Sequence, residues 1–198
     1  GPEPEFFVFD ETPDTVHAKD FRDLKPITPG NFGYSLIKSS VWSDFYRELL
    51  DVSQMMDFPL EGLHEESGPG VLEAAIGVDH ALASADKAAL FKTFAKIVAQ
   101  RHELMATFMA RWSLNYPGQS GHIHLSLKSK NGEAVFYDKK HEHGMSRTMQ
   151  HFVGGCQVLL PEVLAMVAPT INSYTRLVPG YWAPTNATWG VENRTCAI

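Results

Sequence analysis

Near the middle of the chain stands the stretch Pro117-Gly-Gln-Ser-Gly-His-Ile-His-Leu-Ser-Leu127, in which a Gly- and Ser-rich turn leads into a short predicted strand. His122 and His124 lie two residues apart on that strand. Because strand side chains alternate between faces, both imidazoles are expected to project to the same side. The small residues of the turn allow a ligand to approach the backbone closely, beside groups that bind metal or phosphate.

Length and composition favour a folded, acidic protein. The chain has 198 residues, 44% of them hydrophobic, which is enough to bury a core. A net charge of −6 argues against nucleic-acid binding, which usually needs a basic stripe. No apolar run reaches the roughly 18 residues of a membrane span, and no signal-peptide pattern opens the chain. The cysteines, Cys156 and Cys196, lack CxxC spacing, so a cytoplasmic location is expected.

Both ends of the chain fall inside predicted strands. The sequence enters the apolar run Phe6–Phe9 almost at once, and it stops at Thr195–Ile198 with the pattern of a strand. Since natural proteins avoid unpaired strand edges, we expect the chain to be a fragment of a longer protein.

A first acidic pair lies in the strand predicted at residues 1–10, where Glu3 and Glu5 share a face. Two carboxylates on one face repel each other unless a cation or an arginine lies between them. For this pair alone, a solvated strand start is the competing interpretation.

A second acidic pair lies in a predicted hairpin, in which the strand that ends at Glu66 passes through the turn 67–70 into the strand 71–76. In this register His64 pairs with Glu73, and Glu66 lies diagonal to Glu73 on the same face. A bulge in the turn would change the register. A second acidic pair beside a histidine favours a metal site.

Hydrophobic spacing predicts helices outside these strands. Apolar residues recur at helical intervals over 40–51 and 84–103, with Ser40 and Ser84 as N-caps. A third helix, over 145–168, is interrupted by a proline.

Segments without periodicity are predicted to be irregular. Residues 11–33 contain several prolines and glycines and form a long loop in this interpretation. Arg176 and Arg194 also stand in Gly-, Pro- or Asn-rich segments. A guanidinium is a rigid fork for carboxylate or phosphate, and ordinary ion pairs are the alternative.

Together, these residue types indicate a chemistry. Four carboxylates prefer hard cations such as Mg²⁺ or Mn²⁺. Two such ions beside arginines suit phosphoryl transfer, because both neutralise charge on the phosphate oxygens. Zinc hydrolysis fits less well, since zinc favours His- and Cys-rich tetrahedral sets. The residues alone therefore predict a metal-dependent enzyme that acts on phosphates.

Five segments, in order along the chain, resemble motifs of the glutamine synthetases. They are GPEPEFFVF at 1–9, LEGLHEESGPGVLEAAI at 60–76, GQSGHIHLSL at 118–127, NSYTRLVPGY at 172–181 and ENRTCAI at 192–198. The resemblance implies an α+β fold, in which a curved antiparallel sheet, or half-barrel, lines the active site and helices pack outside. It also implies that residues 1–198 are part of the catalytic domain, without the N-terminal β-grasp domain and the C-terminal part.

The resemblance implies roles for residues at matching positions. Glu5, Glu66 and Glu73 would hold a metal ion near the glutamate substrate. Glu3 and His122 would hold a metal ion near the nucleotide phosphates. The implied cofactors are two or more Mg²⁺ or Mn²⁺ ions per site, with ATP as co-substrate.

Other matching positions would bind the substrates. Glu61, His124 and Ser126 correspond to positions that line the ATP site. Gly118 and Arg176 correspond to positions that bind glutamate.

The implied reaction has two steps, in which ATP phosphorylates the glutamate side chain and an amine then displaces phosphate to give an amide. Arg194 matches an arginine that contacts the transferred phosphate, so Arg194 and Arg176 are the expected catalytic residues. Trp182 stands where the family has a glutamate that helps to form the ammonium site. A tryptophan cannot accept a proton, although its face attracts cations. An organic amine or polyamine is therefore expected as the acceptor in preference to ammonia.

Assembly and alternatives follow from the same resemblance. Family members form double hexameric rings, so a homo-oligomer is expected, with no nucleic-acid or membrane partner. A catalytically silent structural relative, similar to the lens protein lengsin, is the main alternative, but the chain keeps all five expected metal ligands. A generic carboxylate metallohydrolase would leave the arginines and the ordered motifs unexplained.

Overall fold

The computed structural model describes residues 1–198. The chain forms two compact units, Gly1–His124 and Leu125–Ile198, each with its own internal packing. None of the helices has the length and apolar content needed to span a lipid bilayer.

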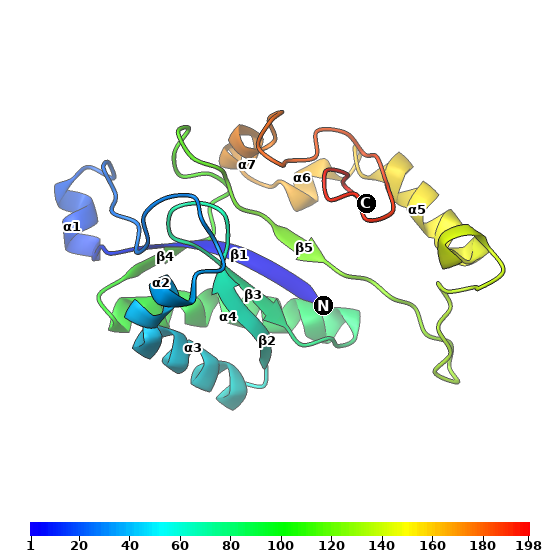
Figure 1. Ribbon diagram of the computed structural model, residues 1–198, viewed down its shortest axis with the longest axis horizontal. Helices are drawn as coiled ribbons and strands as arrows, with labels where there is room; N and C mark the ends of the chain where they lie inside the picture. The colour runs from blue at the N-terminus through cyan, green and yellow to red at the C-terminus, as the bar shows by residue number, and fades with distance from the viewer. The chain divides into compact units, whose positions relative to one another are not determined.

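The first unit is built on an open antiparallel sheet with the first strand at its centre (Figure 1). Its order is β2-β3-β1-β4, and β5 pairs with the N-terminal half of β1, on the edge that β4 occupies further along. The strands are β1 Pro2–Phe9, β2 Leu60–Glu65, β3 Val71–Ile76, β4 Met105–Thr107 and β5 Gly121–Ile123. The predicted α+β class and antiparallel sheet are confirmed.

The central strand separates two different faces of the sheet. Phe6 and Val8 point to one face and belong to the main hydrophobic core. Phe7 and Phe9 point to the other face, where they pack with Val71 in a smaller cluster. Because side chains alternate along a strand, the two glutamates of β1 share the face of Phe7 and Phe9. One strand therefore anchors the core and presents charge at its N-terminal end.

Two long helices, α3 (Ser43–Met55) and α4 (Ala81–Arg101), cover the core face of the sheet (Figure 1). Phe91 of α4 is fully buried and meets the Phe6 ring edge-on, with centroids 5.5 Å apart. Removing such a ring typically costs about 3–5 kcal/mol, so this contact fixes the position of β1. The helix predicted at 84–103 is confirmed, and its apolar side chains Phe91, Ala95 and Val98 lie in the main hydrophobic core.

The segment 11–33, predicted as a loop, contains the short helix α1 (Pro13–Ala18), so the prediction is wrong for these residues. Thr12 and Thr15 form a capping box, and Pro13 occupies the first helical turn, where its missing N–H has no cost. Pro13, one of the prolines that suggested a loop, therefore marks the start of a helix.

A buried carboxylate ties α1 to the following segment. Glu11 is only 3% exposed, and its Oε1 accepts from Lys19 Nζ at 2.5 Å and from the Lys25 N–H at 2.9 Å. Its Oε2 accepts from the Thr15 hydroxyl at 2.6 Å. Burial opposes ionisation, but these bonds outweigh it and lower the pKa of Glu11 to about 2.

The predicted helix starts need correction. The helix expected at 40–51 is split into α2 (Leu36–Val41) and α3, and Ser35 caps α2. Ser40 lies inside α2, and Ser84 lies inside α4, which already begins at Ala81. Both serine hydroxyls bond to preceding backbone carbonyls instead of capping a helix.

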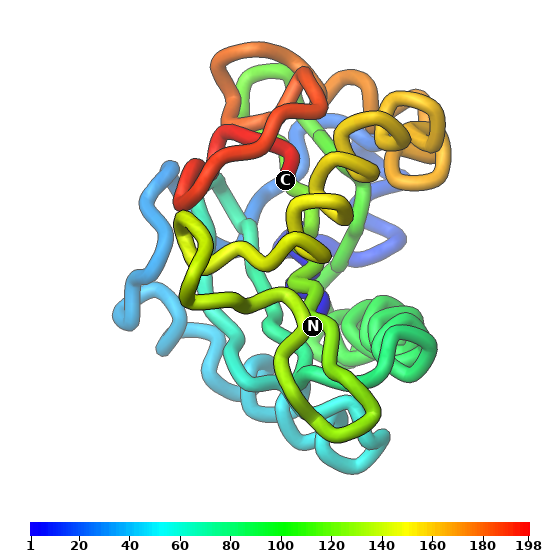
Figure 2. The backbone as a smooth tube through the Cα atoms, turned by 90° about the vertical axis from the view of Figure 1, so that its right-hand side faces the viewer, coloured from blue at the N-terminus to red at the C-terminus, as the bar shows by residue number.

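The second unit is helical and irregular, and Figure 2 shows the long loop that precedes its helices. The helix expected at 145–168 is confirmed as two pieces that are separated around Pro161. Ser146 caps the first piece by accepting from the Met149 N–H at 3.1 Å. The elements are α5 Arg147–Leu159, α6 Leu164–Val167 and α7 Ile171–Arg176, with a 3-10 turn at Glu142–Gly144.

Candidate active site

The register of the sheet brings four of the five expected metal ligands side by side, with His64 next to them. Glu5 lies opposite Glu73 in the β1–β3 pair, and Glu3 lies opposite His122 in the β1–β5 pair. His64 lies opposite Glu73 in the β2–β3 pair, as the hairpin register predicted. Since directly paired residues share a face, these five side chains project from the same side of the sheet.

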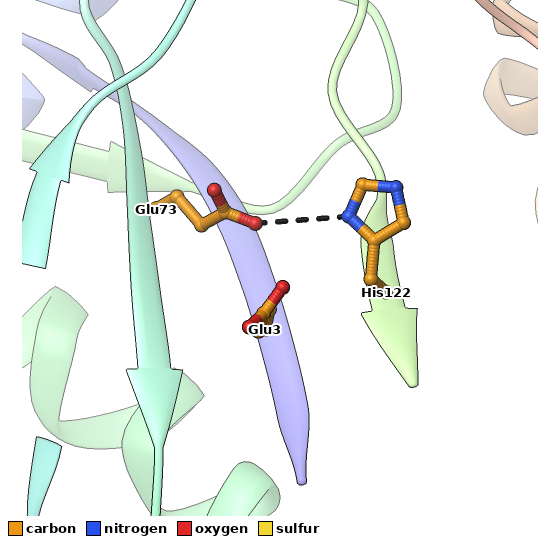
Figure 3. Close-up of side chains that lie close together, drawn as sticks. All are labelled: Glu3, Glu73 and His122. Carbon is orange, nitrogen blue, oxygen red and sulfur yellow. Dashed lines mark ion pairs between the residues drawn. The ribbon is translucent and has the colours of Figure 1, made fainter. Parts of the chain in front are cut away.

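Glu73 stands at the centre of this face and is 8% exposed. Its Oε1 lies 3.7 Å from His122 Nδ1, and its Oε2 lies 3.1 Å from His64 Nε2. Figure 3 shows Glu73, Glu3 and His122 converging from three strands, and one ligand atom from each lies within 4.8 Å of the others. His64, Glu66 and Glu73 form a second group by the same distance. Glu73 therefore links two potential cation sites.

Glu66 is held at the end of β2 by several donors. The hydroxyl of Tyr34 donates to its Oε1, the Ser67 N–H donates to its Oε2 at 3.2 Å, and His64 Nε2 lies 3.2 Å from Oε1. Burial opposes ionisation, but the bonds from Tyr34, Ser67 and His64 prevail and lower the pKa of Glu66. This carboxylate is therefore charged at neutral pH and fixed in direction.

Glu5 has the opposite tendency, because burial raises its pKa and the charges of Glu73 and Glu66 add to that effect. The Ser120 N–H donates to Glu5 Oε2 at 2.6 Å and partly offsets it. A cation beside Glu5 would remove this penalty, since an opposite charge favours the ionised form.

His122, in β5, and His124, the residue after β5, contact different carboxylates. The pKa of His122 is raised, chiefly by Glu73 and further by the charges of Glu5 and Glu3. His124 Nε2 lies 2.9 Å from Glu3 Oε2, and the two imidazole centroids are 6.5 Å apart. The expected division into a metal-side His122 and a nucleotide-side His124 stays a prediction, and both rings border the acidic cluster.

The donor set of this cluster fits a divalent cation. Glu3, Glu66 and Glu73 form ion pairs only with histidines within the first unit, and no lysine or arginine neutralises the cluster. Four carboxylates with imidazoles beside them form an oxygen-rich site of the kind that Mg²⁺ and Mn²⁺ prefer. We refer to Glu3, Glu5, Glu66, Glu73 and His122 as the acidic cluster.

Two further predicted residues of the first unit lie outside the acidic cluster. Glu61 is exposed, in β2 at the irregularity between Leu60 and Gly62. Gly118 is buried in the turn before β5, next to Gln119, whose side chain donates to a backbone carbonyl at 2.8 Å and fixes the turn. Their roles toward ATP and glutamate stay predictions.

Arg176 does not lie in an irregular segment, so that prediction is wrong. It is the last residue of α7, which begins with a capping box between Thr170 and Ser173. The residue is 9% exposed, and its Nη1 and Nη2 donate to the carbonyls of Tyr181 at 2.9 Å and Trp182 at 3.3 Å. Arg176 therefore closes the loop that follows its own helix.

Trp182 and Arg194 meet within the second unit. Trp182 has a positive φ of 54°, and the residue is 68% exposed. The Arg194 guanidinium carbon lies 5.8 Å from the centroid of the Trp182 ring. Arg194 lies in an irregular segment, as predicted.

Ser126, the remaining predicted ATP contact, is exposed in the segment after β5.

Sequence reasoning missed Tyr34, which borders the acidic cluster. Its ring stacks on His64 with centroids 5.1 Å apart, and its N–H donates to the Glu65 carbonyl at 2.9 Å. A Cβ on Gly33 would come within 2.8 Å of the Glu66 backbone, so only glycine lets this segment lie against β2. The glycine before the tyrosine was the one local signal.

Comparison with known proteins identifies the family. The family described as glutamine synthetase, catalytic domain, matches residues 1–198. The chain is 47% identical over 199 residues to type-1 glutamine synthetase 2 of Dictyostelium discoideum. This match covers 100% of the chain and 38% of the Dictyostelium protein. It is 34% identical over 191 residues to glutamate–isopropylamine ligase of a Pseudomonas species, covering 96% of the chain and 42% of that protein.

A solved structure supports the same assignment. The structure of a GmaS/ADP complex superposes with a TM-score of 0.83 at 30% identity and covers 99% of the chain and 45% of that protein. The chain belongs to the glutamine synthetase family and spans about two fifths of the length of the curated relatives described above.

Proposed function

We propose that the complete protein is an ATP-dependent glutamate–amine ligase that forms a γ-glutamyl amide. The observation that carries the proposal is the acidic cluster, which gathers four carboxylates and a histidine in the first unit, where their ion-pair partners are histidines. Family membership supports the reaction class, since curated relatives include a glutamine synthetase and a glutamate–isopropylamine ligase.

The acidic cluster would hold divalent cations, Mg²⁺ or Mn²⁺, which supply charge neutralisation at the phosphate oxygens when they are bound. Glu5, Glu66 and Glu73 would form the part nearer glutamate, and Glu3 and His122 the part nearer ATP. Glu73 contacts both histidines and would be shared between the two parts.

The remaining predicted residues would orient the substrates. We assign Glu61, His124 and Ser126 to ATP, and Gly118 and Arg176 to glutamate. Arg194 would stabilise the negative charge on the phosphoryl group as the bond to ADP breaks and the bond to the glutamate γ-carboxylate forms. The resulting acyl phosphate is then attacked by the amine nitrogen, and phosphate leaves.

The acceptor would be an organic amine. Trp182 carries no group that can take a proton from ammonium or pair with its charge, and its ring is apolar over most of its area. The isopropylamine ligase among the relatives shows that this family uses alkylamines elsewhere. We extend the proposal to a homo-oligomeric, cytoplasmic protein, in line with both cysteines being free thiols.

The test is the substrate profile of the complete protein. With ATP, glutamate and Mg²⁺, we expect ADP release that depends on an added amine, with isopropylamine, ethanolamine or a polyamine at least tenfold better than ammonia in kcat/KM. Trp182→Glu should shift the preference toward ammonia, because a carboxylate stabilises the ammonium ion and accepts its proton.

Two results would contradict the proposal in different ways. Ammonia as the best acceptor would overturn the organic-amine part alone. Absence of any glutamate-dependent ADP release, together with calorimetry showing no Mn²⁺ binding, would favour the silent structural alternative.

A further inference from the structure

We propose that Trp182 is a positioning residue, whose indole ring holds Arg194 in place for the phosphoryl group instead of receiving the charge of the amine. This inference rests on the proposed function, because it concerns the arginine assigned to the transferred phosphate. It changes the expectation drawn from sequence, in which the face of Trp182 was free to attract a cationic substrate.

The contact itself is a cation–π pair. The Arg194 guanidinium carbon lies 5.8 Å from the Trp182 ring centroid, within the roughly 6 Å over which such pairs attract. Tryptophan is the strongest cation–π partner among the side chains, and a planar guanidinium can also stack on it. The ring face that carries the guanidinium is therefore not open to a second cation.

The ring is held in position by its backbone. Arg176 donates one bond to the Tyr181 carbonyl at 2.9 Å and one to the Trp182 carbonyl at 3.3 Å, and Arg176 is itself 9% exposed. Trp182 has a φ of 54°, a conformation that a bulky residue adopts only when its surroundings require it. The buried arginine therefore fixes the backbone that carries the exposed ring.

The residues on either side of Arg194 form a tight turn. Asn193 Oδ1 accepts from the Thr195 N–H at 3.1 Å and from the Thr195 hydroxyl at 2.7 Å, which brackets Arg194 between two fixed neighbours. A Cβ on Gly190 would come within 2.9 Å of Asn193, so the turn is closely packed. No carboxylate of the second unit forms an ion pair with Arg194, so the guanidinium stays available to a phosphate.

A consequence for the acceptor follows from the charges. An alkylammonium ion that approached Trp182 would meet the positive Arg194 and be repelled. The neutral amine, which is the form that attacks an acyl phosphate, meets no such repulsion. The pair of Trp182 and Arg194 therefore favours the uncharged nucleophile while it keeps the arginine in place.

The experiment separates the phosphoryl step from the amine step. Complete wild-type protein and its variants are supplied with ATP, glutamate and Mg²⁺ without an amine, the reaction is quenched, and the acyl phosphate is then trapped with hydroxylamine as a hydroxamate. Trp182→Leu should lower the rate of trapping about two- to fivefold, the usual size of an exposed cation–π contact. Trp182→Phe keeps an aromatic face and should retain most of the rate.

A double-mutant cycle tests whether the effect passes through the arginine. In an Arg194→Ala background, Trp182→Leu should cause no further loss, because the partner of the ring is already absent. Equal losses in both backgrounds, or equal losses for the Leu and Phe variants, would overturn the positioning role.

A structural readout keeps this test independent of the proposed reaction. In crystal structures of the complete protein, Trp182→Leu should release the Arg194 side chain from its position, and Trp182→Phe should preserve it. An unmoved Arg194 in the Leu variant would overturn the inference. If wild-type protein forms no hydroxamate, the proposed function fails, and the structures alone decide whether Trp182 positions Arg194.

Discussion

Glu11 and the acidic cluster, both in the first unit, have opposite surroundings. Glu11 is bound by the Lys19 ammonium, a hydroxyl and a backbone N–H, and its pKa is lowered to about 2. The acidic cluster has only histidines as ion-pair partners, and the pKa of its member Glu5 is raised by burial. The same residue type is thus fully compensated at one place and left uncompensated at another.

The difference separates a structural carboxylate from a candidate ligand. A buried charge is tolerated when the protein supplies its own counter-charge, as Lys19 does for Glu11. Around Glu73 the first unit offers only imidazoles as ion-pair partners, and a divalent cation would supply further positive charge. The comparison predicts that changes at the acidic cluster affect ion binding and changes at Glu11 affect stability.

The largest effect is expected for Glu73→Gln. The amide keeps the shape of the side chain but removes the charge shared by the two groups of potential ligands. We expect the affinity for Mn²⁺, measured by titration calorimetry at neutral pH, to fall about 100-fold or more, because loss of a supporting residue alone costs ~10–100-fold.

The matched control is Glu133→Gln, which alters an exposed glutamate in the turn after residue 128 and should leave Mn²⁺ affinity unchanged. A fall of less than threefold for Glu73→Gln would remove Glu73 from the proposed ligand set. The thermal stability of the metal-free variant should not decrease, since one of several mutually repelling charges is lost.

Glu11→Gln should give the reverse pattern. The amide cannot pair with Lys19, so the ammonium and the Lys25 N–H lose their charged acceptor, and we expect a loss of about 1–3 kcal/mol in the free energy of unfolding. Urea titration measures this loss, and Mn²⁺ affinity should stay at the wild-type value. A stable variant with weakened ion binding would invert the comparison.

The pH dependence of stability should carry the signature of Glu11. Its pKa is about 2 in the folded chain against 4.5 for the ordinary group, so its contribution is fully present above about pH 4.5 and is lost as the pH falls toward 2. Wild-type protein should therefore lose more stability than Glu11→Gln between pH 4.5 and pH 2. Parallel curves from urea titrations across this range would show that Glu11 contributes nothing.

The smallest effect is expected for Tyr34→Phe. The variant keeps the stack on His64 but removes the hydroxyl that donates to Glu66, so Glu66 becomes less fixed in direction. We expect Mn²⁺ affinity to fall about two- to tenfold, as for one partly exposed charge-assisted bond. Tyr34→Leu, which also loses the stack, should bind more weakly still, and equal affinities for the two variants would show that the stack is irrelevant.

Much of the fold could be predicted where local pattern and tertiary packing agree. The strand at Pro2–Phe9 and the helix α4 have strong apolar patterns, and both were placed within a few residues. The register of His64 against Glu73 followed from the turn between their strands. Helix starts were harder to predict from the sequence. A serine such as Ser40 or Ser84 can cap a helix or bond to a carbonyl within one, and only the packed structure decides which of the two it does.

The candidate site was predictable in its residue types and less so in its supports. Glu3, Glu5, Glu66, Glu73 and His122 were recognised from alternation and from motif resemblance. Tyr34 was missed because its contact with Glu66 depends on Gly33 lying against β2, a long-range packing event without a periodic signal. The contact between Trp182 and Arg194 joins two irregular segments, and no periodic pattern in the sequence places them together.

The pairing of β5 with the start of β1 has a consequence for the order of folding. This pairing brings Ser120 to Glu5 and His124 to Glu3. The sequence separation is 115 positions for the first contact and 121 positions for the second. Contacts of such long range carry a large loop-closure entropy and tend to form after local helices and hairpins. An ion held by Glu3, Glu73 and His122 would link β1, β3 and β5 at once, so ion affinity would report whether the chain has finished folding.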